Sequence, residues 1–250
     1  MAEEQKYASE VIDLPSEGKL YSKDHPCRNG KIELKYMTAK EEDILTSANL
    51  IKKGVVVDKL LDSLIVTENV NVSDLVVGDK NALMVAARVL AYGPEYDCEI
   101  THPITAEKIQ HTFNLADCPF KKLPDGVTEN KFEVKLPISK KTITFKLLTG
   151  NEEKNIEEDL KASKKIGIQV SPDLTTRLRH TITSVDGDTK PETINNFVQN
   201  MLARDSLFLR NEIRKSTPDI EMTQEVEIEG ETVKVTIPMT VNFFWPTIEW

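Results

Sequence analysis

Two cysteines and two histidines in one short segment are the residues of this sequence best suited to bind a ligand. Cys98, His102, His111 and Cys118 follow one another with the spacing C-x3-H-x8-H-x6-C. Thiolate and imidazole groups are the ligands of tetrahedral structural zinc. The spacing differs from that of a zinc ribbon, in which a C-x2-C turn brings two sulfurs together. Two interpretations therefore stay open: a structural zinc site, or two partly buried thiols and two histidines that bind no metal.

Motifs for catalysis are missing from the sequence. It contains no G-x-x-x-x-G-K-[ST], no G-x-G-x-x-G and no G-x-S-x-G, so phosphate cradles and nucleophilic serines have no support. The acidic runs at residues 41–43, 152–153 and 157–159 lie in the first turns of predicted helices, where carboxylates complement the positive end of the helix dipole. No acid or nucleophile is arranged around any histidine. We expect a protein that is not an enzyme and has no cofactor other than the zinc considered above.

Aromatic residues gather in the last ten positions. Phe243, Phe244, Trp245 and Trp250 are four of the fifteen aromatic residues of the chain. Large aromatic side chains are typical anchors of protein–protein interfaces. They could bind a partner, or Phe243 and Trp245 could cover the core of the second half. A partner role is favoured for Trp250, because the end of a chain is hard to bury.

The composition limits the kinds of partner and the compartment. The chain has 250 residues and a net charge of −9, which argues against nucleic acid or anionic lipid as the main partner. Three cysteines cannot form a disulfide framework and suit a reducing compartment. No apolar run approaches the ~20 residues that span a bilayer, and no export signal is evident. We expect the protein to remain in the cytoplasm where it is made.

The elements that would position these residues occur twice, which predicts a tandem duplication with an α+β fold. Alternating residues predict a strand over 31–36, and Thr38 with Glu41 then forms a capping box that starts a helix. The same pattern recurs 111 residues later, with a strand over 142–147 followed by Thr149 and Glu152. Because T-x-x-E is a common pattern, a chance recurrence of the box alone is the alternative interpretation.

Further elements recur in the same order. Amphipathic helices are predicted over 57–65 and 174–182, more apolar helices over 80–92 and 205–215, and hairpins over 96–115 and 222–237. We therefore predict an N-terminal arm (1–30), a first α+β repeat with a hairpin and the candidate degenerate zinc ribbon (31–122), and a second repeat with an aromatic tail (123–250). The turn Pro-Asp-Gly at 124–126 marks the boundary.

Two runs of sequence resemble a known family. Residues 36–61, YMTAKEEDILTSANLIKKGVVVDKLL, and residues 75–96, LVVGDKNALMVAARVLAYGPEY, resemble the T4-like bacteriophage baseplate hub family of contractile-tailed phages. The similarity extends from Leu14 to Pro246. Family members often carry a C-P-x-C knuckle where this chain has Thr101-His102-Pro103-Ile104, so the resemblance does not imply metal binding here.

The resemblance implies a late, non-enzymatic phage protein that acts in assembly of the central hub of the baseplate. It would be either a hub component of the virion or an assembly chaperone that acts in the host cytoplasm. Its partners would be other baseplate hub or tail proteins. The alternative function is a zinc-ribbon-type binding module with a structural metal at the first hairpin. The partner, the oligomeric state and retention in the mature particle are left open by the sequence.

Overall fold

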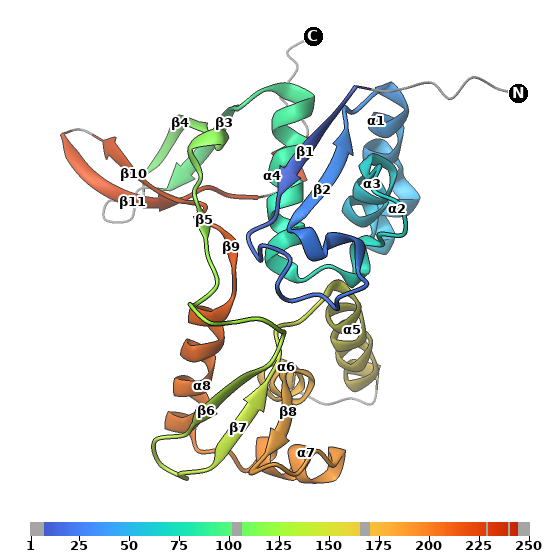
Figure 1. Cartoon of the computed structure of the whole chain (residues 1–250). Coiled ribbons are helices and arrows are strands. Elements are labelled where there is room, and N and C mark those ends of the chain that lie inside the picture. Colours follow the sequence, from blue (N-terminus) through green and yellow to red (C-terminus); the bar gives the residue numbers. More distant parts are fainter. Residues whose placement is uncertain (1–7, 102–106, 166–170, 229, 240, 245–250) are drawn as a thin grey trace, which may run out of the picture.

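The chain has the α+β fold that the sequence predicts. The computed structural model describes residues 8–101, 107–165, 171–228, 230–239 and 241–244. These residues form eight α-helices and five small antiparallel sheets, four with two strands and one with three. Figure 1 shows the helices and first sheet of the first half above those of the second half, with two hairpins side by side at the upper left. None of the helices in these described ranges is long and apolar enough to cross a membrane.

The first half contains the predicted order of strand, capped helix, further helices and hairpin. Its elements are β1 (Ser9–Asp13), β2 (Lys31–Lys35), α1 (Ala39–Thr46), α2 (Ala48–Lys53), α3 (Val56–Leu64), α4 (Val77–Tyr92), β3 (Glu95–Thr101), β4 (Lys108–Asn114) and β5 (Phe120–Lys121). Strands β1 and β2 are antiparallel, with Ile12 opposite Ile32. The segment predicted to be a separate arm thus contributes a strand to the first sheet.

The second half repeats this order with a larger sheet. Its elements are β6 (Phe132–Lys135), β7 (Thr142–Phe145), α5 (Gly150–Lys165), α6 (Asp173–Thr181), β8 (Ile182–Val185), α7 (Pro191–Gln199), α8 (Ala203–Ser216), β9 (Asp219–Ile220), β10 (Thr223–Ile228) and β11 (Glu231–Thr236). Strand β7 lies in the middle of its sheet, between β6 and β8. In the first half a single β-bridge between Leu34 and Ile65 stands where Phe145 pairs with Ile182 in the second.

The two strand-to-helix junctions have the same polar contacts. The Thr38 amide donates to Glu41 (3.0 Å), and the predicted capping box is complete there. The Thr149 amide donates to Glu152 (2.7 Å), which is the same backbone-to-glutamate contact in the second half. Each glutamate also accepts from the last lysine of the preceding strand or its extension, Lys35 at 2.8 Å and Lys146 at 2.6 Å. This agreement in three positions strengthens the interpretation of the halves as related copies.

Each half also has a buried aspartate in the first turn of its long apolar helix. Asp79 of α4 accepts hydrogen bonds from the backbone and hydroxyl of Ser16 (2.9 and 2.5 Å) and from Tyr21 (2.7 Å). Asp205 of α8 accepts from the backbone N–H groups of Ile138 and Ser139, both at 2.9 Å. Each carboxylate thereby ties a helix to the chain beside the first strand of its own half.

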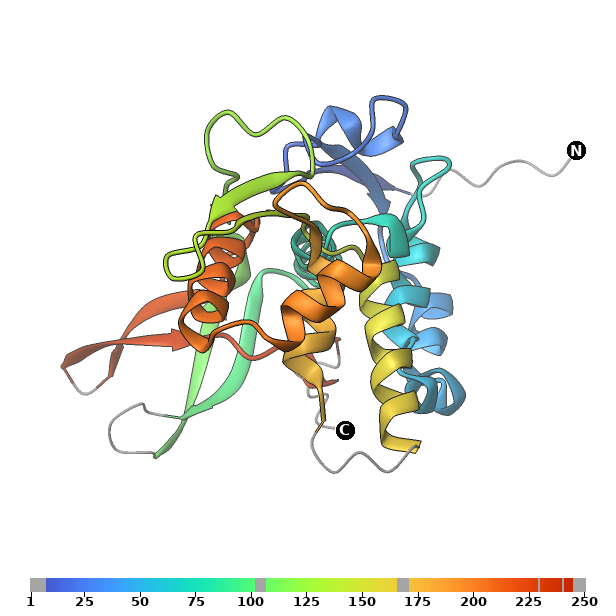
Figure 2. The ribbon, with the colours of Figure 1, turned by 90° about the horizontal axis from the view of Figure 1, so that it is seen from below.

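The halves join where the start of α4 meets the junction between β7 and α5. Val76 and Thr149 form a β-bridge, and the Val77 amide donates to the Leu148 carbonyl. A Cβ on Gly78 would lie only 1.8 Å from the carbonyl oxygen of Pro218, so this close approach requires glycine. Figure 2 shows α5 beside the helices of the first half, consistent with an ion pair between Lys154 of α5 and Asp58 of α3.

Candidate functional site

The sequence-predicted site residues lie in one structural unit built from both halves. Hairpin β3–β4 of the first half and hairpin β10–β11 of the second half lie side by side in two perpendicular views (Figures 1 and 2). Strand β5 pairs with β9, with Phe120 opposite Ile220, and so links the two hairpins. We call these six strands, together with residues 237–239 and 241–244, the hairpin module. The module combines strands from both sides of the predicted boundary near residue 122.

Alternation along the strands explains why the hairpins associate. Tyr96 and Ile100 of β3 are buried on one face, as are Val226 of β10 and Val233 and Val235 of β11. The intervening residues of β3 and β10 are mostly charged or threonine and are exposed. A two-stranded hairpin has only one apolar face and is marginally stable alone. The two apolar faces therefore bury each other, as members of one continuous core.

The C-terminal aromatic residues complete this core. Phe243 and Phe244 are only 2% and 4% exposed, and the ring of Phe243 packs edge-on against Tyr96 with the centroids 5.2 Å apart. The Tyr96 hydroxyl donates to the Pro238 carbonyl at 3.1 Å. Phe243 and Phe244 thus belong to the core of the described chain, which favours the alternative of a core role for Phe243, and their role in binding a partner stays a prediction. The core that Phe243 covers includes Tyr96 of the first half, whereas the sequence predicted a core of the second half only.

The other two aromatic residues, Trp245 and Trp250, lie outside the described residues. Their role in binding a partner stays a prediction.

The hairpin brings two of the four predicted zinc ligands together. Cys98 and His111 are directly opposite each other in the register of β3 and β4, and both are partly buried. Cys118 is buried, and its sulfur accepts a hydrogen bond from Gln224 (3.3 Å). His102 lies outside the described residues. Within the part of the chain that is described, no three histidine, cysteine or acidic side chains group as metal ligands would. The zinc site stays a prediction that metal analysis of the purified protein can test.

The thiols are in their protonated form near neutral pH. Burial raises the pKa of Cys98 to about 11, and the nearby Asp97 carboxylate adds to this effect. Burial also raises the pKa of Cys118 above its ordinary value. A reactive cysteine would need the opposite, a lowered pKa in an electropositive setting. These cysteines therefore behave as small apolar residues of the hairpin core unless a metal displaces their protons.

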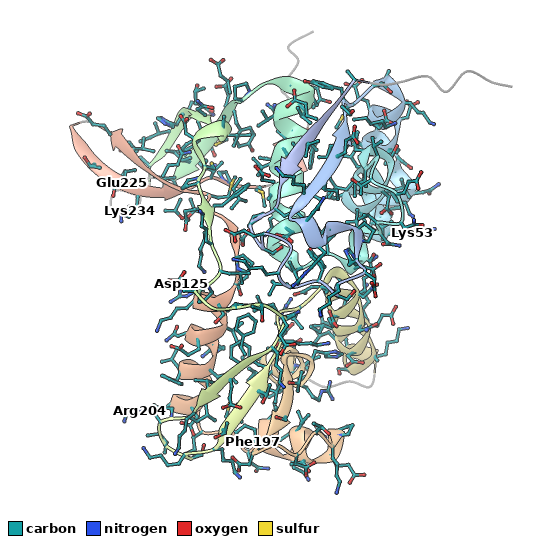
Figure 3. All side chains as sticks on the ribbon, in the orientation of Figure 1. Lys53, Asp125, Phe197, Arg204, Glu225 and Lys234 are labelled. Carbon is teal, nitrogen blue, oxygen red and sulfur yellow. The ribbon has the colours of Figure 1, made fainter. Side chains whose placement is uncertain are left out.

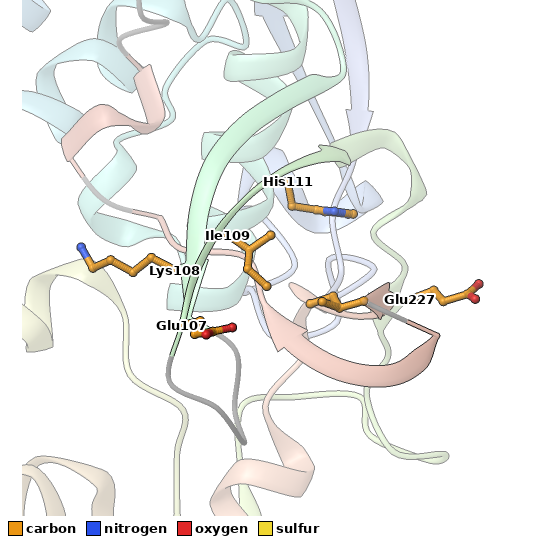
Figure 4. A pocket seen from close by; sticks show the side chains of 6 residues that line it. Glu107, Lys108, Ile109, His111 and Glu227 are labelled. Carbon is orange, nitrogen blue, oxygen red and sulfur yellow. The ribbon is translucent and has the colours of Figure 1, made fainter.

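An open groove of about 630 Å³ lies between the tips of the hairpins. Figure 4 shows Glu107, Lys108, Ile109, His111 and Glu227 around it, together with Ile228. The His111 ring packs edge-on against Phe113, with the centroids 4.6 Å apart. Lys108 forms an ion pair with Glu99 at 2.7 Å. The groove offers a mixed apolar and charged contact surface, and its described lining contains no serine, threonine or cysteine that could serve as a nucleophile beside His111.

The structure also shows two buried polar residues that the sequence analysis does not single out. Asp79 and Asp205, at the starts of two helices, are 0% and 1% exposed. Burial raises the pKa of Asp79 despite its three hydrogen bonds. At Asp205 burial also acts to raise the pKa, but the two backbone N–H donors outweigh it and the pKa is below its usual range. The sequence does contain a signal for these buried aspartates. Each lies two residues after the first residue of its helix, and each half has a Leu-Pro pair, Leu14-Pro15 or Leu136-Pro137, before the strand that precedes the helices.

Comparison with known proteins gives one match. A family model described as T4 bacteriophage base plate protein matches residues 7–245, nearly the whole chain. Neither the curated proteins nor the solved structures include a significant match. The match spans both halves and the hairpin module.

Proposed function

Because this chain belongs to the T4 bacteriophage base plate protein family, we propose that it acts in assembly of the central hub of the baseplate. It does so without catalysis, either as a hub component or as an assembly chaperone, by binding other tail proteins. The family match over residues 7–245 carries the proposal, because it includes every element of the fold described above. Family membership indicates a structural protein of the phage baseplate. The more specific role in the central hub is our proposal.

The architecture supports a role in bridging other subunits. Two related halves give one chain two similar surfaces, which suits a protein that contacts neighbouring subunits of a ring. The two hairpins of the module lie together at the upper left of Figure 1 and contain strands from both halves. Trp245 and Trp250 follow its buried aromatic residues in the sequence, and we assign them to partner contact in the assembling tail.

Mass spectrometry of purified phage particles tests the proposal. A hub component is expected in the particle at a fixed ratio to the other hub subunits. An assembly chaperone is expected in extracts of infected cells, bound to a tail protein, and to be missing from the particle. A chain that is missing from particles and also binds no tail protein in extracts would contradict both forms of the proposal.

A substitution separates partner contact from folding. Trp245→Ala with Trp250→Ala is expected to weaken recovery of tail proteins while thermal stability is retained. Phe243→Ala is the matched control, because it opens a cavity in the hairpin module and should lower stability by about 3 kcal/mol. If the tryptophan variant recovers tail proteins as the unaltered chain does, the assignment of these two residues is wrong.

A further inference from the structure

One face of helix α8 is exposed and carries an unusual set of side chains. Arg204, Leu207, Arg210 and Arg214 are spaced three and four residues apart, so they form a single stripe along the helix. We call this stripe the α8 face. Leu207 is 53% exposed, and two more apolar residues close to the start of the helix are exposed, Leu202 at 51% and Ile138 at 42%. The Ile138 amide bonds to Asp205 of α8, so Ile138 adjoins the α8 face.

The equivalent face of α4 is an interface inside the molecule. The buried aspartates align α4 with α8, so Gly78 corresponds to Arg204 and Asn81 to Leu207. Gly78 lies against Pro218, and the Asn81 amide donates to Asp219 at 3.1 Å. The α4 face is therefore covered by the second half. The corresponding α8 face of the second half is open to solvent, with Leu207 exposed. It is therefore equivalent to a packing interface, but no described part of this chain covers it as Pro218 and Asp219 cover α4.

The contact between Gly78 and Pro218 cannot form at the start of α8, because arginine (Arg204) stands there in place of glycine. The internal interface depends on glycine, because Pro218 approaches the α4 backbone more closely than any Cβ would permit. Arg204 places a long side chain at this point. A second copy of the chain therefore cannot stack on α8 as the second half stacks on α4, so a different partner is required.

The charges on the α8 face indicate which chemical groups the partner carries. None of its three arginines forms an ion pair with a residue that the structure describes, whereas other basic residues of the second half, Lys146 and Arg177, do. The whole chain carries a net charge of −9. Arg210 and Arg214 donate only to neutral oxygens of their own helix, those of Ser206 and Asn211. Guanidinium groups without a described carboxylate partner, beside an exposed leucine, match the composition of interface centres, where arginine is enriched. The exposed Leu202, Leu207 and Ile138 beside the arginines need apolar partner side chains, which a phosphate backbone lacks, so a carboxylate-bearing protein surface fits best.

We propose that the α8 face is a docking surface for an acidic segment of another baseplate protein. Carboxylates of the partner pair with Arg204, Arg210 and Arg214, and an apolar side chain covers Leu207. This inference rests on the proposed function, since it assigns the surface through which the chain binds another tail protein. Figure 3 shows Arg204 at the outer edge of the molecule, on the side opposite to Lys53 of α2.

Charge reversal with a matched control tests the surface. The triple variant R204E/R210E/R214E and the control K40E/K52E/K53E change the net charge equally, and all six side chains are exposed. Tagged full-length chains are produced in infected cells, and the copurified baseplate proteins are quantified. The arginine variant is expected to lose recovery of one baseplate protein by about tenfold or more, and the control to retain it. Thermal unfolding of both variants is measured, and Arg210→Glu alone replaces the triple variant if the latter does not fold.

Crosslinking identifies what lies on the α8 face. A photocrosslinking amino acid substituted for Leu207 is expected to attach to a segment of another baseplate protein with an excess of aspartate and glutamate. A crosslink to nucleic acid, to a second copy of the chain or to a segment without acidic residues would overturn the proposal. Equal recovery of the baseplate protein by both triple variants would overturn it as well. If the unaltered chain recovers no baseplate protein at all, the proposed function itself fails, and the inference fails with it.

Discussion

Helices α4 and α8 begin alike and differ in what covers them. Each starts after a residue in extended conformation, and each carries a buried aspartate two positions further into the helix than its first residue. Val76, just before α4, is 2% exposed because it pairs with Thr149, whereas Leu202, just before α8, is 51% exposed. The comparison teaches that two helices with similar starts can serve as an internal joint and as an outer surface. At the position of closest contact, glycine (Gly78) in α4 is replaced by arginine (Arg204) in α8.

The largest expected effect comes from adding a methyl group at this joint. Gly78→Ala places a Cβ against the Pro218 carbonyl, which belongs to the backbone and cannot rotate away. We expect a loss of at least about 3 kcal/mol in the free energy of unfolding, although alanine favours helix more than glycine does. Arg204→Ala at the equivalent position should change stability by less than about 0.5 kcal/mol. Denaturant unfolding measures both; similar values would show that the helices are not in different environments.

The capping glutamates should differ by a smaller amount. Burial acts to raise the pKa of Glu41, but hydrogen bonds from Lys35 and two hydroxyl groups outweigh it and hold the pKa at about 2. The pKa of Glu152 is also lowered, but its side chain is 21% exposed whereas that of Glu41 is 0% exposed. We expect Glu41→Gln to cost about 2 to 3 kcal/mol at neutral pH and Glu152→Gln about 1 kcal/mol.

The pH dependence of these two variants follows from the sign of the shifts. Because the folded pKa of Glu41 is below the unfolded value of about 4.3, its contribution to stability is present above that value and is lost as the pH falls toward 2. The difference between Glu41→Gln and the unaltered protein should therefore shrink between about pH 5 and pH 2. A difference that stays constant over this range would show that the charge of Glu41 has no part in it.

The two buried aspartates should show opposite responses to pH. Asp205→Asn leaves one of the Ile138 and Ser139 amides without an acceptor and should cost about 2 kcal/mol at neutral pH. Asp79→Asn should cost about 1 kcal/mol, because Tyr21 can turn its hydroxyl to accept from the new amide.

Acidification should narrow the gap between these two aspartate variants. The pKa of Asp205 is lowered on folding, so its contribution to stability is lost as the pH falls through the folded pKa. The pKa of Asp79 is raised, so its contribution is complete at low pH and is lost as the pH rises through the folded pKa. Thermal unfolding of both variants from pH 7 to about pH 2 measures the gap, because the contribution of Asp205 is lost only below the unfolded pKa of about 3.9. A gap that widens on acidification would contradict these signs.

The smallest expected effect concerns the ion pair that crosses between the halves. Lys154 pairs with Asp58 at 3.2 Å and also contacts Ser73, but its side chain is 45% exposed and Lys80 remains beside Asp58. Lys154→Ala should therefore cost only about 0.5 kcal/mol, and less at high salt. Asp43 occupies the equivalent position in the first half and is exposed, so Asp43→Ala should change stability even less. An equal or larger loss at Asp43 would show that the crossing pair adds nothing.

Short sequence patterns were enough to predict the helices and strands. They did not predict how the two halves of the chain pack together. The alternation and the capping boxes predicted at Thr38 and Thr149 are properties of a few adjacent residues. The structure confirms the complete box at Thr38 and has the backbone-to-glutamate contact at Thr149. Alternation in the hairpins also shows which face is buried. It does not show which surface covers that face, because apolar burial has no direction. Thus Phe243 was expected to contact a partner or the second half, and it packs against Tyr96 of the first half.

The candidate site illustrates the same limit. A match of residue types placed Cys98 and His111 in one hairpin, and the register places them opposite each other. The position of Cys118 depends on the hydrogen bond from Gln224, more than a hundred residues away, which no local pattern contains. The importance of Gly78 depends likewise on the distant Pro218. Both contacts join residues that are far apart in the chain, and such pairs cannot be identified from local patterns in a single sequence.

The hairpin module also has a consequence for the order of folding. Tyr96 meets Pro238, which lies 142 positions later in the chain, and such separated contacts raise the contact order and slow folding. During synthesis the first hairpin leaves the ribosome long before the strands that cover its apolar face. Until then Tyr96, Ile100 and Phe113 are open to aggregation or to chaperones of the host. Completion of the module thus requires that translation has passed Phe244, so a shortened chain lacks part of this core.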